Sequence, residues 1–323
     1  MSGAEPIVVT GAAGFIGHAV ARRLLDRGEP VVGVDDFNDY YEVTLKEARA
    51  ADLAGRPGFE LVRMDIADPG ALAALLERSQ PKRVVHLAAQ AGVRYDNAQA
   101  YARSNLVGHL AVLEACRGVP DFEHLVYASS SSVYGERSGE TPFVETDRLG
   151  PPTSLYAATK QADELMSEAY ARLYRLPQTG LRFFTVYGPW GRPDMAYFVF
   201  TRAMLAGEAI PLFAGGELSR DFTYIDDIAD GVLGVLDRPP EDPRRRLFNI
   251  GAGHPEQVLR LVQILQQLLG VRAVTRPTPK PAADVPATFA DVSALTELTG
   301  YAPKVRLEEG LARFVDWYRA YYG

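Results

Sequence analysis

The chain has 323 residues and a net charge of −7, from 34 Lys and Arg against 41 Asp and Glu. This acidic balance argues against general nucleic-acid binding, which needs a basic surface. Hydrophobic residues make up 47% and charged residues 23% of the chain, a composition typical of a folded globular protein and not of a disordered one.

Cysteine content and terminal sequence narrow the class further. The single cysteine, Cys116, excludes an intrachain disulfide and a multi-cysteine metal site, so we expect no metal and a buried, inert thiol. The N-terminus lacks a positive segment followed by a long apolar one, and the apolar runs are too short to cross a bilayer. The sequence therefore predicts a cytoplasmic protein that does not associate with a membrane.

The first half of the chain alternates short apolar strands with helices. We expect strands at 7–10, 31–35, 59–62, 83–87, 125–128 and 179–183, and helices near 14–27, 41–54, 69–78, 97–117 and 154–175. Continuously apolar strands separated by helices are typical of a parallel sheet covered on both faces. The predicted fold is α/β, a Rossmann-type doubly wound parallel sheet with a smaller C-terminal α/β domain.

The rhythm changes after residue 183. A turn-rich loop at 188–193 follows, and we expect a second domain over 184–323, with 224–252 returning to the first sheet as a further strand at 248–251. The prolines between 277 and 286 predict an irregular stretch that runs over a surface or around a cleft.

A glycine recurs at every third position between the first strand and the first helix, at Gly11, Gly14 and Gly17. Such a turn brings backbone amides and a helix N-terminus close to a pyrophosphate, although a tight turn alone would use one or two glycines. Asp35 ends the second strand, where a carboxylate can accept both hydroxyls of an adenosine ribose. The pair predicts a dinucleotide site that prefers NAD over NADP.

Other segments end neighbouring strands on the same edge of the sheet, where ligands bind in doubly wound folds. Asp65 could bond the adenine amino group, or it could cap the helix near 69. The predicted cofactor-binding residues are Gly11, Gly14, Phe15, Ile16, Gly17, Asp35, Asp65, Ile66, Leu87, Ala88, Ala89 and Gln90, together with Tyr156 and Lys160.

Tyr156 and Lys160 lie four residues apart on a predicted helix and therefore share one face. An ammonium group beside a phenol favours the phenolate, which can act as a general base. Such a spacing also occurs by chance as a surface pair. Its position after a dinucleotide turn and the serine cluster 129–132 favours a catalytic role.

With these motifs the chain resembles the extended short-chain dehydrogenases/reductases, and within them the nucleotide-sugar 4-epimerases, from residue 10 to residue 318. The resemblance implies a catalytic triad of Tyr156, Lys160 and Ser130. Ser129, Ser131 and Ser132 are the alternatives for the serine. It also implies an NAD-binding domain over 1–183, a mainly UDP-sugar-binding domain over 184–323, and a homodimer formed by the helices 97–117 and 154–175.

Four longer strings, 89–95, 129–135, 183–195 and 220–227, resemble the UDP-glucuronate 4-epimerases. The chain departs from them at Asp36, where Asn is frequent, and at 281–284. The resemblance implies that NAD removes a hydride from C4 of UDP-glucuronate and returns it to the opposite face of a transient 4-keto intermediate, giving UDP-galacturonate. A UDP-hexose 4-epimerase, a UDP-glucuronate decarboxylase and a non-enzymatic dinucleotide sensor remain alternatives.

The same resemblance implies how the sugar nucleotide is held. Thr185, Arg192 and the hydroxyls of Ser131 and Ser132 are the candidates for the C6 carboxylate, since arginine binds carboxylates as a planar fork. The alternative for Arg192 is a surface arginine in a Pro/Gly loop. The candidates for the nucleotide part are Arg220 and Arg94 at the pyrophosphate and Asp284 near the ribose, although Arg94 could instead form a structural salt bridge.

Overall fold

A computed structural model describes residues 5–93, 96–136, 141–242, 246–279 and 286–323. Its largest element is a seven-stranded parallel sheet in the order β11-β6-β5-β4-β1-β2-β3. The strands are β1 (Ile7–Thr10), β2 (Val31–Asp35), β3 (Phe59–Arg63), β4 (Arg83–His86), β5 (His124–Ser130), β6 (Gln178–Phe183) and β11 (Leu247–Ile250). The predicted doubly wound parallel fold is confirmed.

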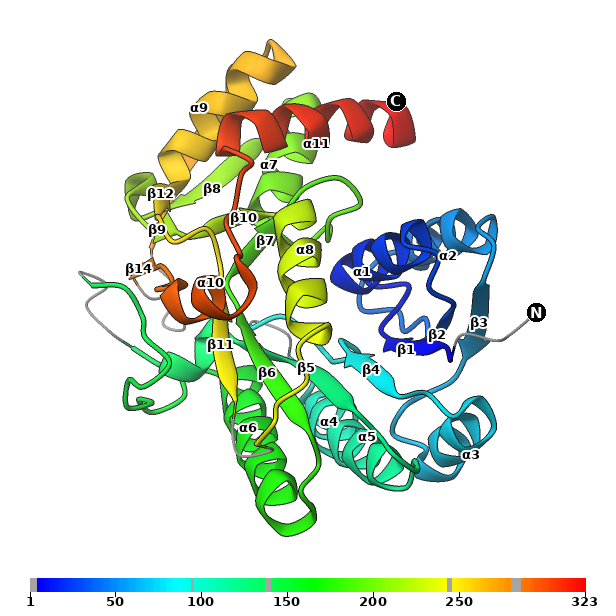
Figure 1. Ribbon diagram of the computed structural model, residues 1–323. Helices are drawn as coiled ribbons and strands as arrows, with labels where there is room; N and C mark the ends of the chain where they lie inside the picture. The colour runs from blue at the N-terminus through cyan, green and yellow to red at the C-terminus, as the bar shows by residue number, and fades with distance from the viewer. Residues whose placement is uncertain (1–4, 94–95, 137–140, 243–245, 280–285) are drawn as a thin grey trace.

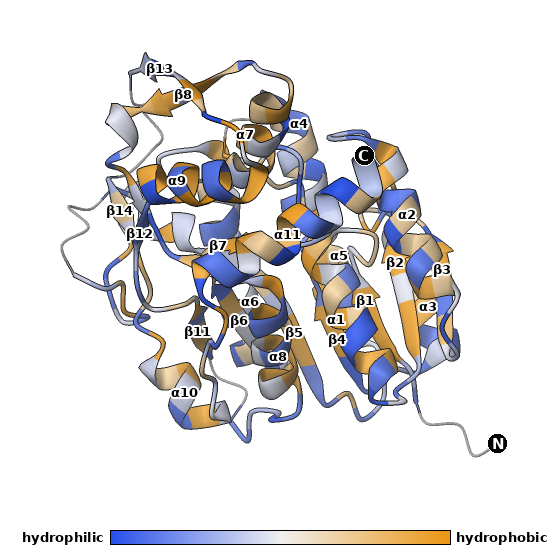
Figure 2. Cartoon of the chain, turned by 90° about the horizontal axis from the view of Figure 1, so that it is seen from above, coloured by the Kyte–Doolittle hydropathy of each residue, from blue (hydrophilic) through white to orange (hydrophobic). Residues whose placement is uncertain are grey.

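Helices cover both faces of this sheet (Figure 1). The helices α1 (Phe15–Asp26) and α8 (Ile225–Leu236) pack on one face beside α2 (Val43–Ala54), and α3 (Pro69–Ser79), α5 (Gly108–Arg117) and α6 (Leu155–Tyr174) pack on the other. Figure 2 shows the apolar strands enclosed between helices that alternate polar and apolar residues. Buried apolar faces on both sides of the sheet explain why its strands are continuously hydrophobic.

The predicted helix near 97–117 is continuous but irregular. It consists of α4 (Ala98–Tyr101), a π-helical segment η1 (Ala102–Val107) and α5. The π-helical segment brings Asn105 into the interior, where its amide donates to the carbonyl of Gln90 at 3.1 Å and to Thr159 Oγ1 at 2.9 Å. The irregular turn thus ties the end of β4 to helix α6.

After β6 the chain leaves the large sheet. The strand β7 (Thr185–Tyr187) pairs with β10 (Phe222–Tyr224). The remaining strands form small sheets from β9 (Ser219–Arg220), β12 (Glu256–Gln257) and β14 (Ala287–Thr288), and from β8 (Ala209–Phe213) and β13 (Val274–Thr278). The helices around them are α7 (Ala196–Leu205), α9 (Val258–Leu269), α10 (Ser293–Thr299) and α11 (Leu307–Tyr322).

The expected irregular stretch 277–286 is wrong at its beginning, because Pro277 lies inside β13. Among the described residues this strand pairs with β8 in a two-stranded sheet, so Pro277 lies on an edge strand, where proline is tolerated. Residues 280–285 of the stretch lie outside the described residues.

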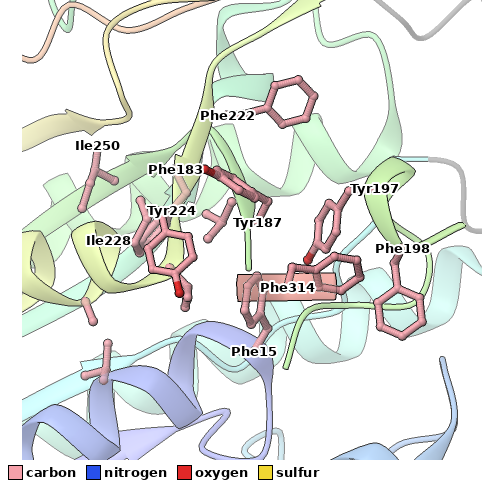
Figure 3. Close-up of a cluster of buried hydrophobic side chains, with 14 of the residues drawn as sticks. Phe15, Phe183, Tyr187, Tyr197, Phe198, Phe222, Tyr224, Ile228, Ile250 and Phe314 are labelled. Atoms are coloured by element: carbon pink, nitrogen blue, oxygen red, sulfur yellow. The ribbon is translucent and has the colours of Figure 1, made fainter. Parts of the chain in front are cut away.

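The chain returns to the large sheet through α8 and β11, and β11 runs parallel to β6 with Phe248 opposite Leu181. Figure 3 shows where the two parts meet: Phe15 of α1, Phe183 of β6 and Phe314 of α11 belong to one buried cluster. Tyr197 of α7 packs edge-on against Phe314 at a ring separation of 4.8 Å. We propose the boundary at residues 183 and 184 for the two domains, with 224–252 assigned to the first.

The structure also bears on the predictions for the cysteine and for membrane-spanning segments. Cys116 is fully buried, and burial raises the pKa of its thiol. Within the described ranges, every helix is too short or too polar to cross a membrane.

Candidate active site

A cavity of about 750 Å³ opens at the carboxyl edge of the sheet, beside the point between β1 and β4 where the strand order reverses. This is the position at which doubly wound sheets bind ligands. Every predicted site residue in the described ranges lines it: Gly11, Gly14, Phe15, Ile16, Gly17, Asp35, Asp65, Ile66, Leu87, Ala88, Ala89, Gln90, Ser130, Ser131, Ser132, Tyr156, Lys160, Thr185, Arg192 and Arg220. Arg94 and Asp284 lie outside the described residues.

The glycine turn packs tightly against the end of β4. Gly11 has a positive φ of +73°, and a Cβ atom there would lie 2.8 Å from the backbone nitrogen of Ala88. A Cβ atom on Gly17 would lie 2.0 Å from the carbonyl oxygen of Gly11. Gly14 precedes α1 without a side-chain hydrogen bond to the helix, so the first amides of α1 are not occupied by a cap. This helix end can hold a phosphate group.

Asp35 stands at the end of β2 and is 7% exposed. Its two carboxylate oxygens accept hydrogen bonds from the amides of Ala13 at 3.0 Å and Phe37 at 2.9 Å. Burial raises the pKa of Asp35, while these amides and the ammonium of Lys46 oppose the rise. The carboxylate is therefore fixed in orientation and faces the cavity beside the glycine turn.

Asp65 is held by a neighbouring amide and by an arginine. Its Oδ1 accepts from the amide of Ala67 at 2.8 Å, and its Oδ2 lies 2.7 Å from Nε of Arg103. The helix that Asp65 was alternatively expected to cap is capped by Asp68, whose side chain accepts from the amide of Ala71 at 3.2 Å. The capping alternative for Asp65 is therefore wrong.

Tyr156 and Lys160 project from the first turns of α6, which Ser154 caps through the amide of Ala157 at 3.1 Å. Lys160 is 3% exposed, and its ammonium donates to the carbonyl of Ala128 at 2.9 Å and to Asp163 at 3.0 Å. Burial acts to lower the pKa of Lys160, but Asp163 and Tyr156 outweigh it and the pKa is raised. The charge beside Tyr156 is therefore kept at neutral pH.

The serine cluster divides into two roles. Ser129 is 2% exposed and donates to Glu164 Oε1 at 2.6 Å, within a buried ion pair that Glu164 forms with Arg182. Ser130 accepts at its Oγ from the amide of Ser132 at 3.2 Å and from the hydroxyl of Ser132 at 3.0 Å. The hydroxyl of Ser129 is thus used by the interior, and Ser130 is the better candidate for the triad.

Arg192 follows β7 in a loop whose side chains line the cavity. Its guanidinium forks onto Asp194, with Nε 3.0 Å from Oδ1 and Nη2 2.5 Å from Oδ2. Tyr40, from the loop after β2, donates to the same carboxylate at 2.9 Å. Arg192 is 22% exposed on its side chain and is not a plain surface arginine. Its charge meets the cavity in partnership with Asp194.

The other predicted substrate residues come from strands of the second half. Thr185 begins β7, and its amide donates to the carbonyl of Asp221 at 3.1 Å. Arg220 lies in β9, and its Nη1 donates to the carbonyl oxygens of Ser219 at 2.8 Å and Pro286 at 3.4 Å. Below them Asp221 is fully buried and accepts hydrogen bonds from three backbone amides, those of Ala252, Gly253 and Ala290.

Several residues of this cavity were not predicted from the sequence. Tyr40, Lys46 and Asp194 all line it, and Lys46 is 4% exposed with its ammonium 2.7 Å from the carbonyl of Asn38. A lysine on the apolar face of a predicted helix was the available signal for Lys46. Tyr40 and Asp194 left no signal, because only the folded chain brings them together. In the described part of the chain no group of three His, Cys, Asp or Glu side chains has a metal-binding arrangement.

Comparison with known proteins identifies the family. The "NAD dependent epimerase/dehydratase family" matches residues 7–251. The chain belongs to this family.

Relatives of this epimerase/dehydratase family member are similar along nearly the whole chain. It is 44% identical to a "Probable UDP-glucuronate 4-epimerase" of Rhizobium meliloti (strain 1021), over 98% of this chain and 97% of that protein. It is 47% identical to "UDP-glucuronate 4-epimerase 2" of Arabidopsis thaliana, over 98% of this chain and 76% of that protein. The crystal structure of UDP-glucuronic acid 4-epimerase from Bacillus cereus, in complex with UDP-glucuronic acid and NAD, superposes with a TM-score of 0.91 at 34% identity, over 98% and 100% of the two chains.

Proposed function

We propose that this protein is an NAD-dependent UDP-glucuronate 4-epimerase, which interconverts UDP-glucuronate and UDP-galacturonate through a transient 4-keto sugar. The observation that carries the proposal is the meeting of Tyr156, Lys160 and Ser130 with the glycine turn and Asp35 around one cavity. Similarity over 98% of this chain to proteins of that name supports the choice of substrate.

The chain's own geometry fits a bound NAD. The glycine turn leaves no room for side chains on the strand side, α1 presents an uncapped N-terminus, and Asp35 accepts from its own turn while facing the cavity. A carboxylate in that position suits ribose hydroxyls and repels a 2′-phosphate, which favours NAD over NADP. When bound, NAD accepts a hydride from C4 of the sugar and returns it to the other face.

The proton at the sugar 4-hydroxyl is assigned to Tyr156. The phenolate removes it as a general base while Ser130 hydrogen-bonds the same oxygen, and Tyr156 gives it back after the sugar has turned. The raised pKa of Lys160 keeps a positive charge beside the phenol oxygen to which the proton transfer is assigned. Asp163 holds that ammonium in the interior.

The carboxylate of the substrate sets a further requirement. A 4-keto uronate is a β-keto acid, which loses CO₂ when its carboxylate bond stands perpendicular to the carbonyl plane. An epimerase must therefore hold the carboxylate away from that orientation. We assign this hold to Ser131, Ser132, Thr185 and Arg192, which line the cavity together. Arg220 is assigned to the pyrophosphate.

A homodimer through α5 and α6 is part of the proposal. Apolar side chains stand exposed on this pair of helices and on the adjoining π-helical segment: Val107, Leu110, Leu155, Leu165, Leu173 and Tyr174, at 41% to 71% exposure. Large exposed apolar groups clustered on one pair of helices favour association with a second copy. Light scattering of wild type and Leu173→Glu tests this assignment, with a monomeric variant expected. The cytoplasmic location stays a prediction from the sequence.

The direct test is to incubate the purified protein, without added cofactor, with UDP-glucuronate and to resolve the products. The expected product is UDP-galacturonate, with NAD released on denaturation because the cycle returns the hydride to its carrier. A UDP-pentose as the main product would indicate a decarboxylase. Epimerisation of UDP-glucose in preference to UDP-glucuronate would indicate a hexose epimerase. Dependence on added NADP would overturn the cofactor assignment.

A further inference from the structure

We propose that Arg49 is a positioning residue that joins the glycine turn of the cofactor side to the loop carrying Arg192 on the substrate side. The inference rests on the proposed function, because it concerns how the uronate is held.

Arg49 lies in α2, and its side chain is completely buried. Its Nη1 donates to the carbonyl oxygen of Ala13 at 3.0 Å and to the hydroxyl of Tyr41 at 2.6 Å. Its Nε and Nη2 donate to the carbonyl oxygen of Trp190 at 3.1 and 2.6 Å, and Nη2 also reaches that of Gly191 at 3.1 Å. All the acceptors of these hydrogen bonds are neutral: three peptide carbonyls and one phenol.

Burying a charge that is bonded only to neutral acceptors lowers the stability of the folded chain. We therefore infer that the hydrogen bonds of Arg49 hold backbone positions that the site needs. The planar guanidinium offers several N–H groups in fixed directions, and a lysine ammonium cannot reach both sides in the same way. The donors of Arg49 point to two segments that are far apart in the sequence. The side chain acts as a bridge between them.

On the cofactor side, the bridge ends at the peptide of Ala13, between the first two glycines of the turn. The amide of the same residue donates to Asp35 at 3.0 Å. Ala13 is therefore held by Arg49 through its oxygen and by Asp35 through its nitrogen. A substitution of Asp35 and a substitution of Arg49 would therefore both affect the position of Ala13.

On the substrate side, the bridge ends at Trp190 and Gly191, directly before Arg192. Trp190 has a φ of +63°, a left-handed conformation that non-glycine residues rarely adopt, so the surroundings must hold it there. The rings of His18 and Trp317 pack against the Trp190 indole at 5.4 Å, while Arg49 fixes its carbonyl. The direction in which Arg192 leaves this turn depends on that conformation.

A second contact runs parallel to the bridge. Tyr40, close to α2 in the sequence, donates to Asp194, which holds the guanidinium of Arg192. The segment from residue 40 to 49 thus grips the substrate loop on both sides of Arg192. Without Arg49 the loop keeps the Tyr40 contact but loses the carbonyl anchors of Trp190 and Gly191.

The test compares Arg49→Lys and Arg49→Met with wild type as NAD-loaded enzymes. The matched control is Arg56→Met, just after α2, which removes an arginine that pairs with Asp26 on the surface. The measurements are kcat and KM for UDP-glucuronate, the fraction of UDP-pentose formed, bound NAD, and thermal unfolding. Misplacement of binding groups by about 1 Å can cost 10²-fold in rate, so we expect kcat/KM to fall at least about tenfold in Arg49→Lys.

The expected pattern is a rise in KM and in UDP-pentose, while bound NAD stays near wild type and Arg56→Met is unchanged. A merely structural role would lower stability without changing product partition. Unchanged kcat/KM and product partition in Arg49→Lys would overturn the proposal, and so would a loss of activity explained fully by unfolding in both variants. Wild type in the same assay reports on the proposed function separately. If wild type epimerises another UDP-sugar, the comparison is made with that sugar.

Discussion

On the cofactor side of the cavity, each predicted carboxylate accepts a hydrogen bond from an amide two residues later in the sequence. Asp35 accepts from Phe37 two residues later, and Asp65 accepts from Ala67. On the substrate side, Arg192 depends on Asp194, whose other partner Tyr40 comes from the opposite half of the chain. The cofactor side is formed mainly by contiguous sequence motifs. The substrate side forms only when the two parts of the chain pack together. The two sides should therefore respond differently to mutation.

We expect the largest loss of activity at Tyr156, the reacting group that serves both the cofactor side and the substrate side. Tyr156→Phe removes the hydroxyl that carries the proton but keeps the ring, so we expect kcat to fall by about 10² to 10⁴ while UDP-sugar and NAD binding persist. Steady-state kinetics and calorimetry measure the two properties. Tyr174→Phe, on the same helix but outside the cavity, is the control and should keep wild-type turnover. Turnover near wild type in Tyr156→Phe would remove this residue from the mechanism.

Arg192→Ala tests the substrate side alone. The loss of a charge-assisted contact costs about 1.5–3 kcal/mol, so affinity for UDP-glucuronate should fall by about one to two decades, and affinity for UDP-glucose much less. Calorimetry with both sugars measures the difference.

The ion pair described above sharpens the Arg192 test. Arg192→Ala removes the positive charge that pairs with Asp194 and leaves only the Tyr40 hydrogen bond, so the Asp194 charge then repels a uronate. Adding Asp194→Asn to Arg192→Ala should therefore restore part of the UDP-glucuronate affinity. Equal losses for the two sugars in Arg192→Ala would assign the arginine to the nucleotide or to the loop.

Acid should destabilise the first half of the chain more than the second. Four of the five histidines, His18, His86, His109 and His124, lie in the first half and are buried, whereas His254 in the second is exposed. Burial lowers the pKa of His109 to about 3 and those of His18 and His124 to about 4, and it also lowers the pKa of His86.

The direction of this pH effect on stability follows from the number of protons bound by the folded and the unfolded chain. Between about pH 6.5 and pH 4 the unfolded chain binds more protons at these histidines than the folded chain does, so stability falls as pH falls through this window. Each buried histidine contributes at most about 1.4 kcal/mol per pH unit. Urea unfolding between pH 7 and pH 5 measures the slope, which His109→Gln should reduce and His254→Gln should not. An equal slope in wild type and His109→Gln would contradict this origin.

The smallest effect is expected at Asp35. Asp35→Asn keeps the shape of the side chain but replaces one accepting oxygen by a donor, facing the amide of either Ala13 or Phe37. One weakened hydrogen bond corresponds to about 1 kcal/mol, so NAD affinity should fall severalfold and discrimination against NADP should narrow. Fluorescence titration of the NAD-free variant with both nucleotides measures this. Unchanged selectivity would mean that Asp35 only shapes the turn.

The same contrast explains what the sequence predicted. The glycine turn, the end of β2 and the spacing of Tyr156 and Lys160 depend on neighbours along the chain, and the predicted strands and helices of the first half agree closely with the structure. The π-helical segment at 102–107 was missed because a shift in backbone hydrogen bonding leaves little trace in the pattern of apolar residues.

Long-range contacts account for the remaining differences. Nothing in the local sequence marks Arg49, because its guanidinium is buried between Ala13 and Trp190, which lie far from it along the chain. Pro277 suggested an irregular stretch, yet an edge position lets it lie in β13. The resemblance favoured Ser130 for the triad and left Ser129 as an alternative, since only the position of Glu164 on α6 shows that the Ser129 hydroxyl faces the interior.

The return of the chain through β11 has a consequence for dissection of the molecule. A fragment ending at residue 183 would lack β11. Strand β6 would then become an edge strand of the sheet, with its backbone groups unpaired on that side. Buried Leu181 and Phe183 would stand near that margin without the second half over them. Unpaired strands of this kind recruit further strands from other chains. The first 183 residues expressed alone would therefore tend to aggregate, and a soluble cofactor-binding fragment would require the segment 225–250 to be grafted back onto it.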